Sequence, residues 1–229
     1  MRSPPSVIMS SLVGSASQAR GAVVVIDVFR AFTTAAIALR NGAEAIVMVE
    51  DLETALTLRN RGVGSRCIGE RRGLRPDGFD FGNSPHEICS VSFAGETLIQ
   101  TTSNGTKCVL AAVSATQVYA ASLVNAEATA RAILASGSEE IWLVACGDGD
   151  RRTDEDEICA LYIRALIQGR LPERSTVSRS IAALSSRADG RTMSAEDLAM
   201  CLDVDSIPVA ISVETSGKSP VARPLARAR

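Results

Sequence analysis

"GAVVVIDVFRAFTTAAIALRNGAEAIVMV", residues 21–49, contains the pattern that decides the fold. Residues 21–27 form a continuous, largely β-branched run, which is typical of a strand buried on both faces of a parallel sheet. Residues 31–43 then predict a helix that ends at an Asn-Gly pair, and residues 45–49 predict a second strand. Strands that alternate with helices in this way indicate a largely parallel sheet covered on both faces.

The rest of the chain repeats this alternation of apolar runs and helical patterns. It predicts an α/β fold of three layers, α/β/α, with a mostly parallel, mixed sheet. We expect one such domain over residues 1–214 and a flexible, basic, proline-containing tail over residues 215–229. The other expected strands are residues 65–69, 97–102, 117–122, 140–146 and 207–213, and the other expected helices are residues 51–62, 106–113, 125–137, a helix from near Thr153, and residues 194–202.

Composition limits the classes of function. The chain has 229 residues, of which 46% are hydrophobic and 22% are charged, so it can bury a large core and is not a disordered protein. A formal net charge of −2 gives no global attraction for nucleic acid or for an anionic membrane, and we expect neither as a partner. Any anion site therefore has to be built from locally placed groups.

The cysteines and the apolar segments indicate the compartment. No two of the six cysteines are closer than 13 residues and no C-x-x-C pair occurs, which argues against a zinc site and a disulfide scaffold. This usage favours a reducing, cytoplasmic location. Serines and a glycine interrupt the apolar residues of positions 1–19, so we do not expect a signal peptide. No stretch approaches the roughly 18 apolar residues of a membrane span.

Polar side chains follow the expected strands at the edge where sheets of this class bind ligands. Asp27 ends the first buried run and Arg30 lies in the turn that follows it. Hydroxyl, amide and backbone N–H donors occupy three further junctions of the same type, and together they resemble a phosphate cradle. These junctions contribute Thr101, Thr102, Asn104, Gly105, Thr106, Ser122, Asn125 and Cys146.

Asp27 is the residue whose position most strongly indicates a function. A carboxylate directly after a fully buried strand destabilises the fold by several kcal/mol unless a metal, an arginine or backbone donors compensate it. For "TDEDE", residues 153–157, two interpretations stay open. Thr153 and Asp156 have the spacing of a capping box, and the same acids could bind a metal ion.

Several other residues also have structural interpretations. Thr106 and Asn125 are ordinary helix N-cap types, and Asn104-Gly105 is an ordinary turn pair. Cys146 has the C-x5-R spacing of cysteine phosphatases, but the acids inside "GDGDR" would repel a phosphate dianion. The single histidine is not next to a nucleophile, which leaves little support for a Ser-His-Asp mechanism.

Five motifs, taken together, resemble one known family. "IDVFRAFTT", "GERRGLRPDGFDFGNSP", "TTSNGT", "ASLVN" and "ACGDGDRRTDEDEICA" stand in the same order as the motifs of the 2-phosphosulfolactate phosphatases, magnesium-dependent enzymes of coenzyme M biosynthesis. The resemblance covers about residues 20–165. Phe29, Phe32 and Ser103 depart from the residues usual in that family, and so does the more acidic loop. These departures leave the exact substrate open.

The resemblance implies that residues 69–85 form an ordered active-site loop and that Mg²⁺ is the cofactor. The substrate would be a small polyanionic phosphorylated hydroxy acid such as (2R)-phospho-3-sulfolactate, and the loop arginines could help to bind its charges. The residues expected to act are catalytic Asp27, Arg30, Glu70 and Cys146; metal ligands Asp27, Glu70, Glu155 and Asp156; and substrate-binding Arg71, Asn83, Ser84, Thr101, Thr102, Asn104, Gly105, Thr106, Ser122 and Asn125.

Three alternatives remain at this stage. Either water or Cys146 could attack phosphorus, and the same cradle could instead belong to a non-catalytic binder of a small phosphorylated metabolite. A haloacid-dehalogenase-type mechanism is disfavoured because Asp27 is not part of an Asp-x-Asp pair. A homodimer is compatible with the exposed edges expected of a mixed sheet.

Overall fold

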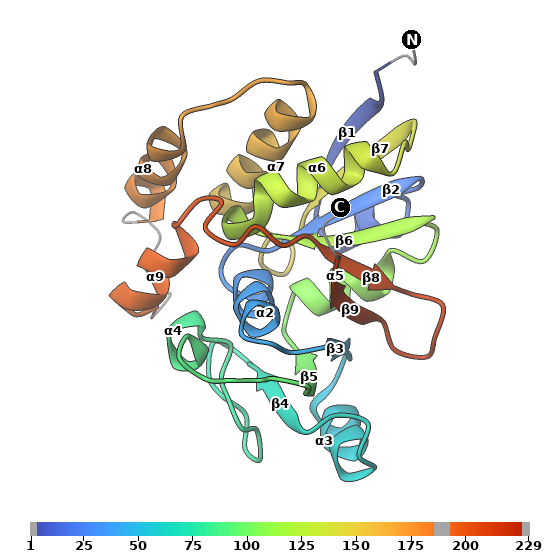
Figure 1. Cartoon of the computed structure of the whole chain (residues 1–229), viewed down its shortest axis with the longest axis vertical. Coiled ribbons are helices and arrows are strands. Elements are labelled where there is room, and N and C mark those ends of the chain that lie inside the picture. Colours follow the sequence, from blue (N-terminus) through green and yellow to red (C-terminus); the bar gives the residue numbers. More distant parts are fainter. Residues whose placement is uncertain (1–3, 186–192, 226–229) are drawn as a thin grey trace.

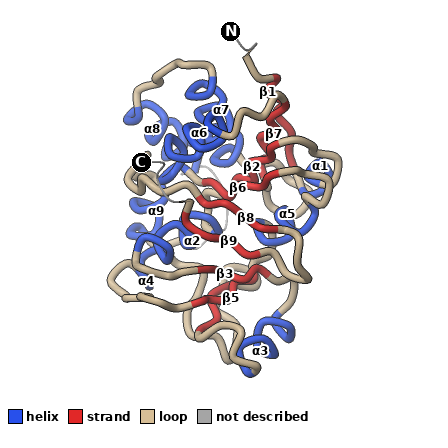
Figure 2. Tube along the Cα trace, turned by 45° about the vertical axis from the view of Figure 1, so that its right-hand side comes forward, coloured by secondary structure: helices blue, strands red, loops and turns tan. Residues whose placement is uncertain are grey.

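The computed structural model describes residues 4–185 and 193–225. These residues form one nine-stranded sheet in the order β1-β7-β2-β6-β8-β9-β3-β5-β4. Figure 2 shows the strands as a central band with helices on both sides, which confirms the three-layer α/β arrangement. No helix in the described part of the chain combines the length and the apolar character needed to cross a membrane.

The sheet consists of two parallel blocks joined by an antiparallel hairpin. β8 and β9 lie between the blocks and pair antiparallel with β6, with each other and with β3 (Figure 1). The first block contains β1 (Ser6–Ser11), β7 (Glu140–Ala145), β2 (Ala22–Ile26) and β6 (Gln117–Ala121). The second block contains β3 (Ala45–Met48), β5 (Thr97–Thr101) and β4 (Arg66–Gly69), and the hairpin is β8 (Ile211–Glu214) with β9 (Val221–Pro224).

The helices lie mainly in the connections between strands. The pattern of residues 31–43 forms a helix that ends at Arg40, directly before the Asn-Gly pair, because Asn41 and the positive φ of Gly42 lead the chain out of it. The helices are α1 (Val13–Ala16), α2 (Ala31–Arg40), α3 (Leu52–Asn60), α4 (Pro85–Ile88), α5 (Gly105–Ala111), α6 (Ala126–Ala135), α7 (Asp154–Ile167), α8 (Arg174–Ser185) and α9 (Ala195–Cys201), with a 3-10 turn at Leu123–Asn125.

The C-terminal segment differs from the expectation of a frayed tail. Residues 221–224 form β9, and Ala222 on this strand is fully buried, so the prediction of a flexible tail is wrong for these residues. A four-residue strand that contains arginine and proline has too weak a local pattern to be recognised, and its hydrogen bonds to β8 and β3 stabilise it. The last tail residues, 226–229, lie outside the described residues.

Five elements were absent from the expected set: β9, described above, the short helices α1 and α4, and also β1 and α8. β1 pairs in parallel with β7 along its whole length, although its serines conceal the apolar pattern of a strand. α8 packs beside α7, and its many serines and arginines similarly conceal an amphipathic helix. The strand expected at residues 207–213 begins only at Ile211, after an extended segment anchored by the bond from Ile207 N to Val124 O.

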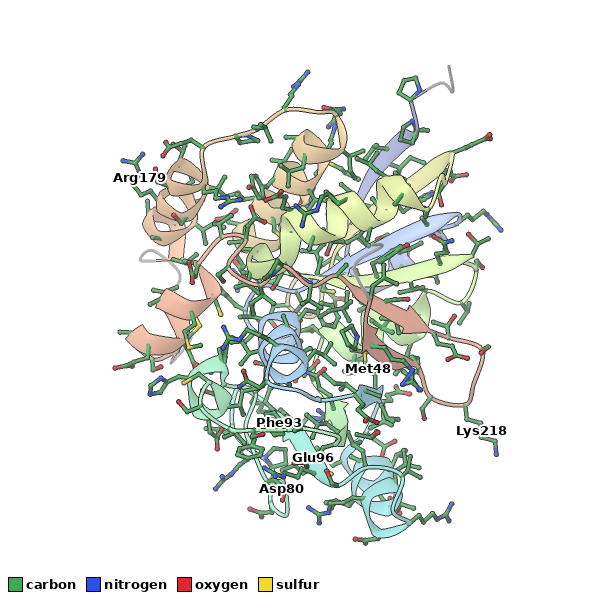
Figure 3. All side chains as sticks on the ribbon, in the orientation of Figure 1. Met48, Asp80, Phe93, Glu96, Arg179 and Lys218 are labelled. Atoms are coloured by element: carbon green, nitrogen blue, oxygen red, sulfur yellow. The ribbon has the colours of Figure 1, made fainter. Side chains whose placement is uncertain are left out.

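α2 lies in the interior of the molecule. Its residues 31–39 are all buried, as expected for a helix that is apolar on every side. They share one hydrophobic core with side chains of both parallel blocks, including Met48 and the fully buried Phe93, labelled in Figure 3. A second core lies on the other face, where α6 and α7 cover β2 and β7. Arg179 and Lys218 project at the periphery.

The position of the site follows from the twist of the sheet. Three successive antiparallel pairings, β6 with β8, β8 with β9 and β9 with β3, join the blocks, so the strands of the second block run opposite to those of the first. Adjacent strands rotate by about 20–25°, so the five steps from β2 to β5 accumulate to about 100–125°. A twist of this size allows the carboxyl ends of β2 and β5 to meet, and residues that follow both strands line one cavity. Gly105, just after β5, lies directly against Asp27, just after β2.

Candidate active site

A cavity of about 290 Å³ lies where these strand ends converge. Five acidic residues and two arginines line it, so its walls carry more negative than positive charge. Loops from both parallel blocks and residues from α7 contribute to it. The lining residues are Asp27, Phe29, Arg30, Glu70, Arg72, Gly73, Asn83, Thr102, Ser103, Asn104, Gly147, Asp148, Glu155, Asp156 and Met193.

Asp27 is held at the junction of β2 and α2. Its Oδ1 accepts a hydrogen bond from Ala31 N (2.9 Å), one of the first-turn N–H groups that lack a partner within the helix. The side chain is 6% exposed and lines the cavity. A Cβ at position 105 would lie 2.7 Å from Asp27 Oδ2, so only glycine permits the β5–α5 turn to approach this carboxylate so closely.

Asp156 is the most deeply buried acid of the cavity. Its Oδ1 accepts from Val28 N (2.8 Å) and its Oδ2 from Gly147 N (2.9 Å), so it joins the turn after β2 to the turn after β7. Burial raises the pKa of Asp156 well above its usual value, and the nearby carboxylates of Asp27 and Glu155 raise it further. The two backbone N–H donors act in the opposite direction and do not cancel the increase.

The capping-box interpretation of Thr153 and Asp156 is wrong. Thr153 precedes α7 as its N-cap, but its side chain makes no capping hydrogen bond. Asp156 instead uses both carboxylate oxygens on backbone donors of other loops. Glu155, from the same helical turn, is 8% exposed and lines the cavity. The first turn of α7 therefore delivers two acids to the site.

Glu70 organises the loop that follows β4. Its Oε2 accepts from Gly73 N (2.8 Å) and from the Ser103 hydroxyl (3.2 Å), and its Oε1 accepts from Ser103 N (2.7 Å). These bonds tie the loop to the β5–α5 turn. Glu70 therefore lies in the cavity wall as expected, with three donors already on its carboxylate.

The "TTSNGT" segment contributes to the cavity only in part. Thr102 and Asn104 line it, whereas Thr106 is fully buried and exchanges hydrogen bonds with Thr102 that stiffen the turn. Asn104 donates to Asp148 Oδ1 (3.1 Å) and accepts from Gly149 N (3.0 Å), which joins this turn to the loop after β7. Thr101 faces the other way and donates to Glu50 O.

Arg30 and the end of the 69–85 loop meet at α9. The Arg30 guanidinium pairs with Asp197 of α9, which also accepts from the Ser84 hydroxyl (2.8 Å) and from His86 N (2.9 Å). Arg30 lines the cavity, and Ser84 lies behind it in this network. Asn83, also in the lining, is 6% exposed, and its Oδ1 has no hydrogen-bond partner among the described residues.

Besides Gly105, which lies against Asp27, four other expected site residues lie outside the cavity lining. Arg71 donates to Glu70 O, Glu50 O and Thr101 Oγ1, so its guanidinium anchors the loop start. Ser122 and Asn125 are fully buried. The Asn125 side chain accepts a hydrogen bond from Ser122 N and donates to Ala120 O and Val209 O, and these bonds organise the chain before α6. The fourth of these residues is Cys146.

Cys146 is fully buried and does not line the cavity. Burial raises the pKa of its thiol well above the usual value, and Cys108 and the carboxylates of Asp27 and Asp156 raise it further. A reactive cysteine needs an accessible, electropositive setting that lowers its pKa. The surroundings of Cys146 have the opposite properties and favour a structural thiol.

Sequence reasoning missed Asp197 and Asp148. Asp197 lies in "SAEDLAMCL", where Ser194 caps the helix by accepting from Asp197 N, and this local role is all that the sequence indicates. Its contact with Arg30 spans 167 residues. Asp148 was noted only as one of the acids of "GDGDR". Neither residue has a local signal that would identify its partner.

The described residues contain no group of three or more His, Cys, Asp or Glu side chains placed to hold one metal ion. Mg²⁺ nevertheless does not require such a cage, because it retains waters and is commonly bound through one or two carboxylates and substrate phosphate. The hard oxygen atoms of Asp27, Glu155 and Asp156 line the cavity, together with the unpartnered Asn83 Oδ1. These donors fit an open Mg²⁺ site.

The fold and the cavity define an α/β protein with a candidate ligand site at the carboxyl ends of parallel strands, between a carboxylate wall and an arginine-bearing loop. The same region holds four of the five motifs on which the family resemblance depends. The family model described as 2-phosphosulpholactate phosphatase matches residues 8–215, and the chain therefore belongs to this family.

Individual relatives agree with this assignment. A protein of Deinococcus radiodurans named probable 2-phosphosulfolactate phosphatase is 43% identical over 143 residues, which are 62% of this chain and 59% of that protein. A Thermus thermophilus protein of the same name is 40% identical over 152 residues, or 66% of this chain and 63% of that protein. The matched segment thus spans about three fifths of these relatives.

Proposed function

We propose that this protein is a Mg²⁺-dependent phosphomonoester hydrolase that acts on a small polyanionic phosphorylated hydroxy acid of the 2-phosphosulfolactate type. The observation that carries the proposal is the gathering of Asp27, Glu155 and Asp156 in one cavity with Arg30 and Arg72. The names of the Deinococcus and Thermus relatives support the choice of substrate class.

The charge of the cavity supports the requirement for a metal ion. Five carboxylates line it against two arginines, and one of these, Arg30, is already paired with Asp197. A phosphate dianion would be repelled from such a site unless a cation neutralised the acids. One or two of the carboxylates of Asp27, Glu155 and Asp156 would hold Mg²⁺, with Asn83 Oδ1 as a further oxygen donor. When bound, the ion would supply charge neutralisation at the phosphoryl oxygens and could lower the pKa of water.

The residues of the chain have separable tasks in this proposal. Arg30 uses one terminal nitrogen on Asp197, and its remaining N–H donors can bind a phosphoryl oxygen. Glu70 and Asn104 hold the loops in place, so that the cavity is largely formed before substrate binds. In hydrolysis the oxygen of water bonds to phosphorus, the ester P–O bond breaks, and the proton lost by water is balanced by the one gained by the alcohol.

Water is favoured over Cys146 as the attacking group. The buried thiol does not line the cavity, and its raised pKa leaves it protonated at neutral pH. The second candidate function, a non-catalytic binder of a phosphorylated metabolite, uses the same cavity without turnover. Release of inorganic phosphate distinguishes the two.

The test is a panel of phosphorylated hydroxy acids assayed for phosphate release with Mg²⁺ and with excess EDTA. We expect release only with Mg²⁺, and Asp27→Asn should lower kcat/KM by about 10² or more, because it removes a charge next to the transferring group. Asp77→Asn is the matched control, since Asp77 is exposed in the 69–85 loop and outside the cavity lining. Full activity in EDTA would contradict the metal requirement, and no release from any ester would favour the binder.

The setting of the reaction belongs to the same proposal. We place the protein in the cytoplasm and in coenzyme M biosynthesis, and the six free cysteines support a reducing compartment. A homodimer would cover edge strand β1 or β4 of the sheet.

A further inference from the structure

A strained turn follows β4 at the cavity. Arg71 and Leu74 exchange backbone hydrogen bonds (3.0 and 3.1 Å) around the two central residues Arg72 and Gly73. Both central residues have positive φ, 55° at Arg72 and 79° at Gly73, which is the pattern required by a type I′ turn. Asn, Asp and Gly are the usual residues at the first position. An L-residue with a long side chain is disfavoured there, because its Cβ crowds the carbonyl oxygen.

Arg72 differs from the other two arginines of the 69–85 loop. Arg71 is held by three acceptors, and Arg75 bonds Asp80 O and Glu87 outside the cavity. Arg72 lines the cavity and is exposed, and its guanidinium has no hydrogen-bond or ion-pair partner among the residues that the structure describes. A disfavoured conformation that places an unpaired charge in a ligand cavity indicates a functional role.

The turn that carries Arg72 is fixed in position. Gly73 N donates to Glu70 Oε2, and the same carboxylate binds Ser103 of the β5–α5 turn. Arg72 thus projects from a backbone braced on both sides. A pre-organised guanidinium binds an oxyanion with less loss of conformational entropy than one on a free loop.

The two cavity arginines lie on different elements. Arg30 precedes α2, beside Asp27 and the proposed metal ligands, where the phosphoryl group would bind. Arg72 comes from the loop after β4 in the other parallel block. We propose that Arg72 binds the second anionic group of the substrate, the carboxylate or sulfonate that is not transferred, and thereby selects acidic phosphoesters over uncharged ones. This inference rests on the proposed function.

The test compares two phosphate esters that differ in one group, 2-phospholactate and isopropyl phosphate. Arg72→Gln should raise KM for 2-phospholactate by about 10-fold to 100-fold, the value of one charge-assisted bond, while kcat changes by less than about threefold. Its kinetics with isopropyl phosphate should not change. Arg75→Gln removes the same charge from the same loop outside the cavity, and its KM should stay within about twofold of the wild type.

A second variant separates function from folding. Arg72→Gly relieves the positive φ, so it should unfold at a higher urea concentration than the wild type and yet show the same rise in KM. If Arg72 had only a structural role, a variant that is more stable than the wild type would not show a higher KM. Equal KM values for 2-phospholactate in wild type and Arg72→Gln, or an equal loss with isopropyl phosphate, would overturn the inference.

A binding measurement tests independently of turnover whether Arg72 binds an anionic group. Calorimetric titration with malate, a hydroxy acid with two carboxylates, should give at least tenfold weaker affinity for Arg72→Gln than for wild type, in the presence of Mg²⁺. If no ester is hydrolysed, the proposed hydrolase function fails, and this affinity ratio still tests Arg72. The same affinity in both proteins, or no binding to either, would refute the role of Arg72.

Discussion

Replacing Asp197 with asparagine tests the link between α9 and the cavity. The Asp197 side chain is 4% exposed and its partner Arg30 is 14% exposed, so this ion pair is largely removed from water. The Ser84 hydroxyl and His86 N donate to the other carboxylate oxygen. Asparagine keeps the size of the side chain and one acceptor oxygen but removes the charge that Arg30 faces.

The magnitude follows from this burial. Loss of a hydrogen bond between charged groups lowers the free energy of unfolding by about 1.5–3 kcal/mol. Removal of one partner of a fully buried ion pair lowers it by about 3–5 kcal/mol. Arg30 retains some solvent contact and lies in a cavity lined by other acids, so we expect the lower part of this span, about 2–3 kcal/mol. For a chain of this size, that corresponds to a decrease of about 4–12 °C in Tm.

Urea unfolding of a double-mutant cycle measures the pair itself. Asp197→Asn, Arg30→Gln and the combined variant should give a coupling free energy of at least about 1.5 kcal/mol. Arg131→Gln is the control, because its ion pair with Glu127 is solvent-exposed and should contribute less than about 0.5 kcal/mol. A coupling below about 0.5 kcal/mol at Arg30–Asp197 would refute the assignment of a buried, strongly interacting pair.

Three further predictions concern other parts of the molecule. Gly105→Ala should destabilise the fold by about 1–3 kcal/mol and reduce phosphate release, because the new Cβ would lie 2.7 Å from Ala31 Cβ. Urea unfolding measures the loss of stability, and Gly14→Ala, which adds a Cβ in open space, is the control that should not lower it. Burial raises the pKa of the Cys67 thiol to about 11, so the folded state retains a proton that the unfolded chain loses at lower pH. Stability should therefore fall as pH rises from about 9 to about 11, and urea midpoints measured across this span should fall less in Cys67→Ala. Cys146→Ala should retain phosphate release within about threefold, and complete loss from a folded variant would favour the thiol route.

Local sequence patterns were sufficient for the elements that have strong periodicity. The β-branched run before Asp27 and the apolar run after it form β2 and α2, because their burial on every side requires side chains without polar atoms. Of the polar residues expected at strand ends, Asp27, Thr102 and Asn104 line the cavity, whereas Ser122, Asn125 and Cys146 do not. The rule applies because parallel strands within a block end at one edge.

The same rule could not separate lining residues from supporting ones. Arg71 and Arg72 are neighbours with the same side chain, yet Arg71 anchors the backbone and Arg72 lines the cavity. The two residues differ in the turn, because Arg71 begins it and Arg72 occupies its first central position with positive φ. Thr101 and Thr102 separate in the same way, because successive residues of a strand point to opposite faces.

The sequence by itself determined the α/β class, the family and the strand ends at which the site would be found, because these depend on residues close together in the chain. Only the tertiary structure decided that β9 completes the sheet and that Asp197 pairs with Arg30 across 167 residues. Both features depend on partners brought together by the twist and packing of distant segments. A short strand or a single carboxylate has no local pattern that specifies such a partner, so its role emerges only when the chain is folded.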